Sequence, residues 1–248
     1  MITATFHEEV FRDKVALVAG GTSGIGAAIG NALAELGASV TVTGATAAEA
    51  EEAQARPNFW VERAVALDVR DAAAVGACLA SLSRLDILIN CAATIRRGEE
   101  HDPQVFAQVV DVNLNGTLRL CSAARPLLSA AKGCIVNTAS VLSFFGGALV
   151  PGYSASKGGV AQLTKSLALA YAAEGIRVNA VAPGWIATPL TQALRDDPQR
   201  NAAIVARTPL GRWGEPDEIA GAAVFLCSPA AGFVTGTILA VDGGYMAG

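Results

Sequence analysis

Short apolar runs rich in β-branched residues recur along the chain, and stretches with helical periodicity separate them. The runs are bounded by Gly, Asn, Asp or Pro, which favour turns at strand ends. Strands that alternate with helices form βαβ units, and these pair into a parallel sheet with right-handed crossovers. We therefore predict strands at residues 15–19, 39–43, 62–67, 85–89, 134–137, 177–181 and 237–241. The clearest helical stretches are residues 24–36, 105–128 and 154–173.

The composition favours a single doubly wound α/β domain over residues 1–248. The chain is 52% hydrophobic and 16% charged, with a mean hydropathy of +0.41. No uninterrupted apolar run reaches the roughly 18 residues of a membrane span, so the apolar surplus indicates a sheet buried on both faces. Residues 1–13 form a charged arm without the apolar core of a signal peptide, which predicts a cytoplasmic protein.

The balance of charged and metal-ligating residues excludes several classes of function. A net charge of −4 with no basic run argues against a nucleic-acid surface. The five cysteines are scattered and form no CxxC pair, which disfavours zinc and disulfide frameworks. With His7 and His101 as the only histidines, a histidine base or a histidine-rich metal site is improbable. We expect a small-molecule substrate and no metal, nucleic-acid or membrane partner.

A glycine cluster lies where the first predicted strand meets the first predicted helix. The sequence there is Gly20-Gly21-Thr22-Ser23-Gly24-Ile25-Gly26. Glycines permit a sharp turn and the close approach of a pyrophosphate, whose charge the free N–H groups of the helix start can hold. This junction predicts a dinucleotide site that includes Gly20, Thr22, Ser23, Gly24, Ile25 and Gly26.

Tyr153 and Lys157 are four residues apart at the start of a predicted helix, so they share one helical face. A tyrosine with a pKa of about 10 needs a drop of roughly three units, or ~4 kcal/mol, to act as an acid or base near neutrality. A lysine ammonium about 4 Å away supplies about that energy at an effective dielectric near 20. The pair therefore predicts proton transfer at Tyr153.

The Gly-x-x-x-Gly-x-Gly spacing and the Tyr-x-x-x-Lys pair resemble the short-chain dehydrogenase/reductase superfamily, from about Lys14 to the C-terminus. The resemblance implies a Rossmann domain, a mostly seven-stranded parallel sheet flanked by helices, and an NAD(P) cofactor. It also implies a catalytic tetrad of Asn113, Ser140, Tyr153 and Lys157. In this tetrad Tyr153 moves the proton, Ser140 orients the substrate oxygen, Asn113 holds a relay water, and Lys157 also holds the nicotinamide ribose.

The same resemblance extends the cofactor site beyond the glycine cluster. It implies that Asp68 binds the adenine edge, Asn90 steadies the sheet and Thr188 contacts the nicotinamide carboxamide. The chain departs from the family pattern at Ala19, where the family has Thr, and at Ala93, where it has Gly. The further cofactor residues are Gly44, Ala45, Thr46, Asp68, Val69, Asn90, Ala92, Tyr153, Lys157, Pro183, Gly184, Ile186 and Thr188.

The end of the second predicted strand bears on the choice between NAD and NADP. An Asp there would bind the ribose 2′-hydroxyl, and an Arg would attract a 2′-phosphate. This chain has neither, since the strand runs into Gly44-Ala45-Thr46. Gly44 leaves room for a phosphate and Thr46 can donate a hydrogen bond to it, so NADP is slightly favoured.

Segments 94–97, 140–147, 191–196 and 211–214 are similar to the 2-deoxy-D-gluconate 3-dehydrogenase and gluconate 5-dehydrogenase group. Two guanidinium groups at a strand end, Arg96 and Arg97, suit bidentate binding of a carboxylate; the alternative is that both are surface charges. The predicted substrate residues are Arg96, Arg97, Ser140, Leu142 and Trp185. Residues 188–207 are predicted to form a substrate lid, with a solvated pair of surface helices as the alternative.

Two rival functions remain open on the sequence. A 3-oxoacyl-[acyl-carrier-protein] reductase would need a basic surface for its acidic carrier, but this chain has four lysines and a net negative charge. A non-catalytic dinucleotide sensor would not need the tetrad. The resemblance also implies a homotetramer, and residues 105–128 and 154–173 are richer in Ala and Leu than one buried face requires.

Overall fold

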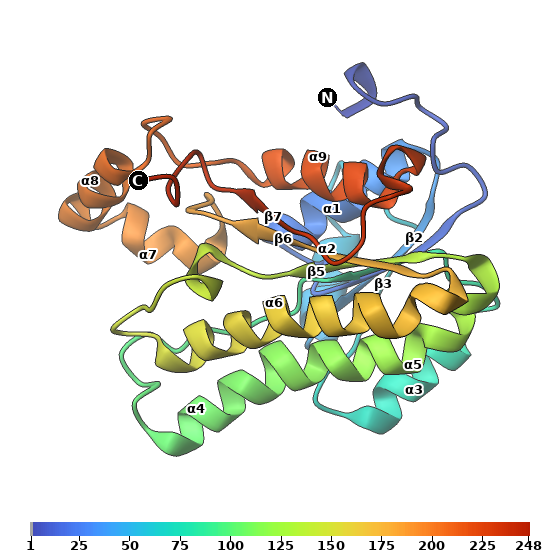
Figure 1. The fold of residues 1–248 in the computed structure, drawn as a ribbon, viewed down its shortest axis with the longest axis horizontal. Helices are drawn as coiled ribbons and strands as arrows, with labels where there is room; N and C mark the ends of the chain where they lie inside the picture. The colour runs from blue at the N-terminus through green and yellow to red at the C-terminus, as the bar shows by residue number, and fades with distance from the viewer. Residues whose placement is uncertain (1) are drawn as a thin grey trace.

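The fold is a seven-stranded parallel sheet with helices on both faces, seen in a computed structural model that describes residues 2–248 (Figure 1). All seven predicted strands are present, with ends shifted by at most two residues. The strand order is β3-β2-β1-β4-β5-β6-β7. The strands are β1 Val15–Ala19, β2 Ser39–Gly44, β3 Arg63–Ala66, β4 Ile87–Asn90, β5 Cys134–Thr138, β6 Arg177–Pro183 and β7 Ile238–Val241.

The direction of winding reverses between β1 and β4. At the carboxyl end of β1, Ala19 pairs with Thr43 of β2 on one side and with Asn90 of β4 on the other. Because the chain leaves β1 and β4 toward opposite faces of the sheet, a crevice opens at their carboxyl ends, where doubly wound folds bind ligands.

Two helical layers cover the sheet (Figure 1). α1 packs with α9 on one face, and α3 to α6 lie on the other, where α3 contacts α5 and α4 contacts α6. Each layer encloses its own apolar core, so the central strands are buried on both faces, as their continuous apolar runs predict. The helices are α1 Gly24–Glu35, α2 Ala47–Gln54, α3 Ala72–Ala80, α4 Pro103–Val110, α5 Gly116–Ala131, α6 Pro151–Tyr171, α7 Gln192–Arg195, α8 Pro198–Arg207 and α9 Pro216–Cys227.

Two predicted helices differ from the structure in ways that matter for the site. The single helix predicted over residues 105–128 is α4 and α5 joined by a π-helical turn, Asp111–Asn115. A π-helical turn is a single turn that inserts one residue, and it is shorter than the roughly 11–18 residues over which helical periodicity is recognised, so the pattern still predicts one helix. The helix predicted from residue 154 begins at Pro151, which suits the first helical position because proline has no N–H to leave unpaired.

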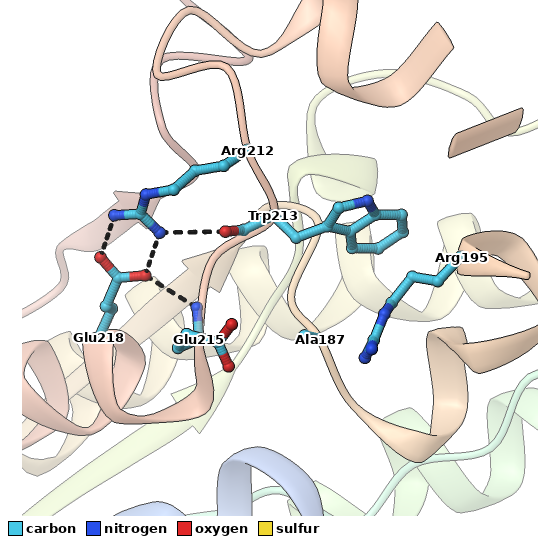
Figure 2. A pocket seen from close by; sticks show the side chains of 6 residues that line it. All are labelled: Ala187, Arg195, Arg212, Trp213, Glu215 and Glu218. Atoms are coloured by element: carbon cyan, nitrogen blue, oxygen red, sulfur yellow. Dashed lines mark hydrogen bonds and ion pairs between the residues drawn. The ribbon is translucent and has the colours of Figure 1, made fainter. Parts of the chain in front are cut away.

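The predicted lid, residues 188–207, leaves the carboxyl end of β6 and carries α7 and α8, which lie together at one end of the sheet (Figure 1). Trp213 Nε1 donates to Asn201 Oδ1 at 2.7 Å and so ties α8 to the segment that follows it. Figure 2 shows how that segment is anchored: Arg212 donates to both carboxylate oxygens of Glu218, at 2.6 and 2.7 Å. Glu218 in turn accepts the Glu215 N–H at 2.8 Å, at the start of α9.

The N-terminal arm packs against the α1–α9 layer. Phe11 is buried in this core, and Ile2, Phe6 and Val10 pack against it. Among residues 2–248, no helix is both long enough and apolar enough to cross a bilayer.

Candidate active site

A groove of about 770 Å³ runs along the carboxyl edge of the sheet, above the crevice between β1 and β4. It gathers residues from five separate loops, because all strands of a parallel sheet end at the same edge. The predicted cofactor residues that line it are Gly20, Thr22, Ser23, Gly24, Ile25, Gly26, Gly44, Ala45, Asp68, Val69, Ala92, Tyr153, Lys157 and Thr188.

The glycine cluster forms a cradle with no room for side chains. A Cβ on Gly20 would lie 2.5 Å from the Ala92 nitrogen, and Gly20 has a φ of +72° that favours glycine. A Cβ on Gly26 would lie 2.1 Å from the Gly20 carbonyl oxygen. The turn thus brings bare backbone to the groove at the start of α1, which fits the pyrophosphate of a dinucleotide.

Thr43 supplies a hydrogen bond to the cradle that Ala19 does not. The Gly20 N–H points to Thr43 Oγ1 at 3.4 Å, and the Gly21 N–H donates to the Thr43 carbonyl at 2.9 Å. Thr43 lies opposite Ala19 in the sheet, so a hydroxyl from the neighbouring strand meets the loop there. The position of Thr43 was not predicted from the sequence, because the pairing of Ala19 with Thr43 depends on strand register.

Five predicted cofactor residues lie outside the groove wall. Thr46 accepts the Glu49 N–H and caps α2, and Asn90 donates to Asn137 Oδ1 at 2.8 Å between β4 and β5. Pro183 is buried in β6, and a Cβ on Gly184 would lie 2.7 Å from the Asp242 Cα. Ile186 is buried and forms a bridge with Gly214. These residues shape the loops behind the groove.

Tyr153 and Lys157 meet at the floor of the groove, one turn apart on α6. Lys157 is 2% exposed, its Nζ donates to the Thr138 carbonyl at 2.6 Å, and it lies 5.6 Å from the centre of the Tyr153 ring. The half-buried Cys91 thiol approaches Thr138 Oγ1 at 3.1 Å on the same side. The structure therefore brings the predicted pair together, held by the end of β5.

The predicted lowering of the Tyr153 pKa is wrong for the ligand-free protein. Burial raises the pKa of Tyr153 to about 12, while the Ser140 hydroxyl and the Arg97 guanidinium lower it and the Glu100 carboxylate raises it. Burial also lowers the pKa of Lys157 to about 8. The cost of removing both groups from water outweighs the attraction between their charges that the spacing predicts.

Asn113, between α4 and α5, and Ser140, just after β5, are the other two predicted members of the tetrad. Asn113, fully buried in the π-helical turn, accepts the Thr94 N–H at 2.8 Å and donates to the Thr94 carbonyl and Ser156 Oγ, both at 3.0 Å. Its amide thus braces the loop after β4 against α6, and its predicted relay water stays a prediction. Ser140 accepts the Leu142 N–H at 3.1 Å and is 8% exposed.

The predicted substrate residues do not all reach the groove. Arg96 lines it, with Glu99 at 3.9 Å as its ion-pair partner. Arg97 is half-buried beside Tyr153, and burial lowers its pKa, as does the guanidinium of Arg200 on α8. Leu142 is half-buried in the turn that follows Ser140.

Trp185 belongs to an aromatic cluster beneath the lid. Its ring packs edge-on against Trp213 at 6.0 Å and Tyr245 at 6.1 Å, and its N–H is buried without a partner among residues 2–248. Arg207, at the end of α8, lies 4.2 Å from the centre of the Tyr245 ring. This cluster attaches the lid to the C-terminal tail, so a packing role accounts for the position of Trp185.

Two buried or groove-lining carboxylates were missed by the sequence analysis. Glu49 lines the groove and accepts the Ala45 N–H at 2.8 Å. Glu100 is 1% exposed and accepts the N–H groups of Arg96 and Tyr153. A Thr-x-x-Glu pattern at Thr46 and Glu49 resembles a capping box and could have drawn attention to Glu49, whereas no local pattern indicates the role of Glu100.

The buried lysine predicts a specific dependence of stability on pH. Between about pH 8 and 10 the unfolded chain keeps the Lys157 proton that the folded chain has lost, so the unfolded state binds more protons and stability rises with pH. Above about pH 10 the raised pKa of Tyr153 acts in the opposite direction. Replacing Lys157 with Met should abolish a rise on the order of 2 kcal/mol between pH 7.5 and 9.5.

Urea denaturation of the coenzyme-free protein at several pH values in this window measures that rise. Lys165→Met is the matched control, since Lys165 lies exposed on the same helix. The thiols of Cys91, Cys121 and Cys227, whose pKa values burial raises, lower the stability of all three proteins as the pH rises, so the contribution of Lys157 is taken as a difference from wild type. The control should keep a constant difference from wild type, whereas the stability of Lys157→Met relative to wild type should fall by about 2 kcal/mol between pH 7.5 and 9.5. A constant difference for Lys157→Met would mean that Lys157 makes no such contribution.

Comparisons with known proteins agree with this geometry. A family model described as enoyl-(acyl carrier protein) reductase matches residues 19–246. The 2-dehydro-3-deoxy-D-gluconate 5-dehydrogenases of Pseudoalteromonas atlantica and Bacillus subtilis are each 44% identical to this chain. The alignment with the first covers 94% of this chain and 96% of the relative, and the alignment with the second covers 95% of each. The structure of a gluconate 5-dehydrogenase from Burkholderia cenocepacia J2315, in complex with NADP and tartrate, is 33% identical with a TM-score of 0.89 and covers 98% of this chain and 100% of its own.

The family match and these alignments span nearly the whole chain, and the glycine cradle and the Tyr153–Lys157 pair lie within them. The protein is therefore a member of the short-chain dehydrogenase/reductase superfamily, an NAD(P)-dependent oxidoreductase that acts on CH–OH groups.

Proposed function

We propose that this enzyme interconverts a hydroxyl and a keto group on a sugar acid of the gluconate or deoxygluconate type. The observation that carries the proposal is the pair of cationic side chains beside the acid–base tyrosine: Arg96 lines the groove and Arg97 lies close enough to Tyr153 to lower its pKa. Guanidinium groups bind carboxylates bidentately, so they can fix one end of such a substrate while the other end meets Tyr153. The names of the relatives support the same class.

The catalytic roles follow from where the side chains lie. NAD(P) supplies the hydride acceptor or donor when it is bound. In the oxidation direction the Tyr153 phenolate would take the proton of the substrate hydroxyl, and the Ser140 hydroxyl beside Tyr153 would orient the oxygen. The ionised tyrosine requires a lower pKa than in the ligand-free protein, and the cation at Lys157 together with Arg97 favours that ionisation.

The substrate proposal is tested by following reduced nicotinamide absorbance with keto sugar acids, with ketoses of the same length that lack the carboxylate, and with a 3-oxoacyl thioester. We expect turnover of the keto acids, with Arg97→Met raising their KM at least tenfold and leaving the KM of the neutral ketoses unchanged. Turnover of the thioester alone would overturn the proposal and favour the 3-oxoacyl-[acyl-carrier-protein] reductase function.

For the coenzyme, NADP is slightly favoured over NAD. β2 ends at Gly44, where an Asp would repel a 2′-phosphate, and the Burkholderia cenocepacia relative has NADP bound. Glu49 limits the preference, because its carboxylate already holds the Ala45 N–H, the backbone donor that a 2′-phosphate would meet there. The carboxylate and a 2′-phosphate would repel each other.

Replacing Glu49 with Gln should therefore raise the ratio of kcat/KM for NADP to that for NAD by about tenfold, because the like charge is removed at constant size. Glu51→Gln is the control, since it makes the same charge change on the exposed face of the same helix. The ratio is measured from initial rates with both coenzymes at one ionic strength. An unchanged ratio in Glu49→Gln would remove Glu49 from coenzyme selection.

The lid, the assembly and the location are part of the same proposal. α7 and α8 lie where a lid over the groove would lie, and Pro189 and Leu190 of that segment line the groove.

Leu118 on α5 and Leu169 on α6 are 42% and 84% exposed, which supports a homotetramer built through these helices. Light scattering should give the mass of four chains, and Leu169→Asp should yield smaller species. The five unpaired cysteines suit a reducing cytoplasm.

A further inference from the structure

Glu100 is a carboxylate buried outside the groove whose position the catalytic roles above do not explain. It is 1% exposed and precedes α4 by only a few residues. Carboxylates are seldom buried to this degree unless both oxygens are bonded, because losing water is costly for a charge. Here one oxygen, Oε1, accepts the Arg96 N–H at 2.8 Å, and the other, Oε2, accepts the Tyr153 N–H at 2.7 Å.

The second of these bonds lies at the N-terminus of the helix that carries the acid–base tyrosine. Tyr153 is the third residue of α6, and the residue before the helix, Val150, has no side chain that can cap it. The first N–H groups of a helix lack partners within the helix and carry partial positive charge. A carboxylate from a distant loop therefore caps α6 at Tyr153 itself.

The bond to Arg96 is one of several connections between the loop that follows β4 and the segment that leads into α6. The Gly98 N–H donates to the Leu149 carbonyl at 2.8 Å, and His101 Nε2 donates to the Ala148 carbonyl at 2.8 Å. Gly152 permits this approach, because a Cβ there would lie 3.2 Å from Glu100 Oε2 and 3.3 Å from a Phe106 ring carbon. Glu100 is the only residue among these whose side chain bonds both segments at once.

We propose that Glu100 is a positioning residue that sets the distance and orientation of the Arg96–Arg97 loop relative to Tyr153. This inference rests on the proposed function, in which the arginines hold the substrate carboxylate and Tyr153 acts on its hydroxyl. A sugar acid joins these two sites by a chain of fixed length, so a small displacement between them misplaces the reacting carbon, and errors of about 1 Å can cost roughly 10²-fold in rate.

The test compares Glu100→Gln with Glu99→Gln. The neighbouring Glu99 is exposed, and its replacement makes the same change of charge without the two backbone bonds. Its ion pair with Arg96, 3.9 Å long between two exposed side chains, contributes little because solvent screens it. Glutamine at residue 100 has one acceptor oxygen, and its NH2 group faces the other backbone N–H, so one end of the bridge is lost. We expect Glu100→Gln to lower kcat/KM for a keto sugar acid by about 10- to 100-fold and Glu99→Gln to stay within about twofold of wild type.

Two further readouts separate positioning from general loosening of the fold. Hydrogen exchange of peptides that contain Arg96 and Tyr153 should speed up in Glu100→Gln only. The pH profile of alcohol oxidation should also move to lower pH: of the charged groups around Tyr153, Arg97 and Lys157 favour its ionised form and Glu100 opposes it. Damage to the fold alone would lower activity without shifting the pH profile to lower pH.

The outcomes distinguish the inference from the proposed function. If wild type turns over only neutral alcohols, the sugar-acid proposal fails, while the exchange rates and the pH profile still test the role of Glu100. A folded Glu100→Gln with the exchange rates, pH profile and kcat/KM of Glu99→Gln would overturn the inference. Should Glu100→Gln not fold, Glu100→Asp keeps the charge but reaches one N–H group, and wild-type kinetics in that variant would overturn it equally.

Discussion

Replacing Tyr153 with Phe should lower kcat by about 10²- to 10⁴-fold, the usual contribution of a positioned proton donor or acceptor. The variant loses only a buried hydroxyl, and the ring that lies over Lys157 stays in place. Coenzyme affinity, followed by the fluorescence of bound reduced nicotinamide, should change by less than about threefold. The loss should therefore fall on the chemical step rather than on binding.

Tyr171→Phe provides the matched control, because Tyr171 is also buried on α6, near its far end. It should keep kcat within about twofold of wild type. If Tyr153→Phe retained wild-type turnover with every substrate, Tyr153 would not be the acid–base group. The assignment of the tetrad would then need a different proton carrier, and no other tyrosine lines the groove in the described part of the chain.

Gly26→Ala should destabilise the protein by about 3 kcal/mol or more and weaken coenzyme binding at least tenfold. The added Cβ would lie 2.1 Å from the Gly20 oxygen and 2.9 Å from the Gly20 carbonyl carbon. Both are backbone atoms of the cradle, so no side-chain rotation can relieve the overlap, and the loop must move away from α1. The same displacement would spoil the turn that receives the pyrophosphate.

Gly76→Ala makes the same chemical change where space is available. Gly76 lies exposed on α3, and a Cβ there meets nothing within 4 Å. Because alanine favours the helix over glycine, this variant should gain about 0.5–1 kcal/mol. Urea denaturation and coenzyme titration of both variants provide the measurement. Equal stabilities for the two variants would show that the cradle adapts and that its close contacts do not constrain Gly26.

The architecture and several residues that line the groove were predictable because they depend on local patterns. The seven strands appear in the sequence as short apolar runs, and the cradle appears as glycines at a strand-to-helix junction. The π-helical turn that holds Asn113 was not predictable, since its five residues are far fewer than the roughly 11–18 over which helical periodicity is recognised. The predicted cofactor residues that do not line the groove, such as Ile186 and Gly184, lie close in sequence to Thr188, which does, and loop conformation decides which of them face the groove.

The sequence by itself determined the doubly wound fold, the glycine-rich turn at the start of α1 and the pairing of Tyr153 with Lys157 on one face of α6. Only the tertiary structure decided the electrostatic state of that pair, because burial moves the pKa of Tyr153 up and that of Lys157 down, against the attraction expected from their spacing alone. It also decided the placement of Glu49 and Glu100. Their partners are loop and helix N–H groups, and Glu100 reaches Tyr153 across 53 residues of chain, a contact that no periodicity encodes.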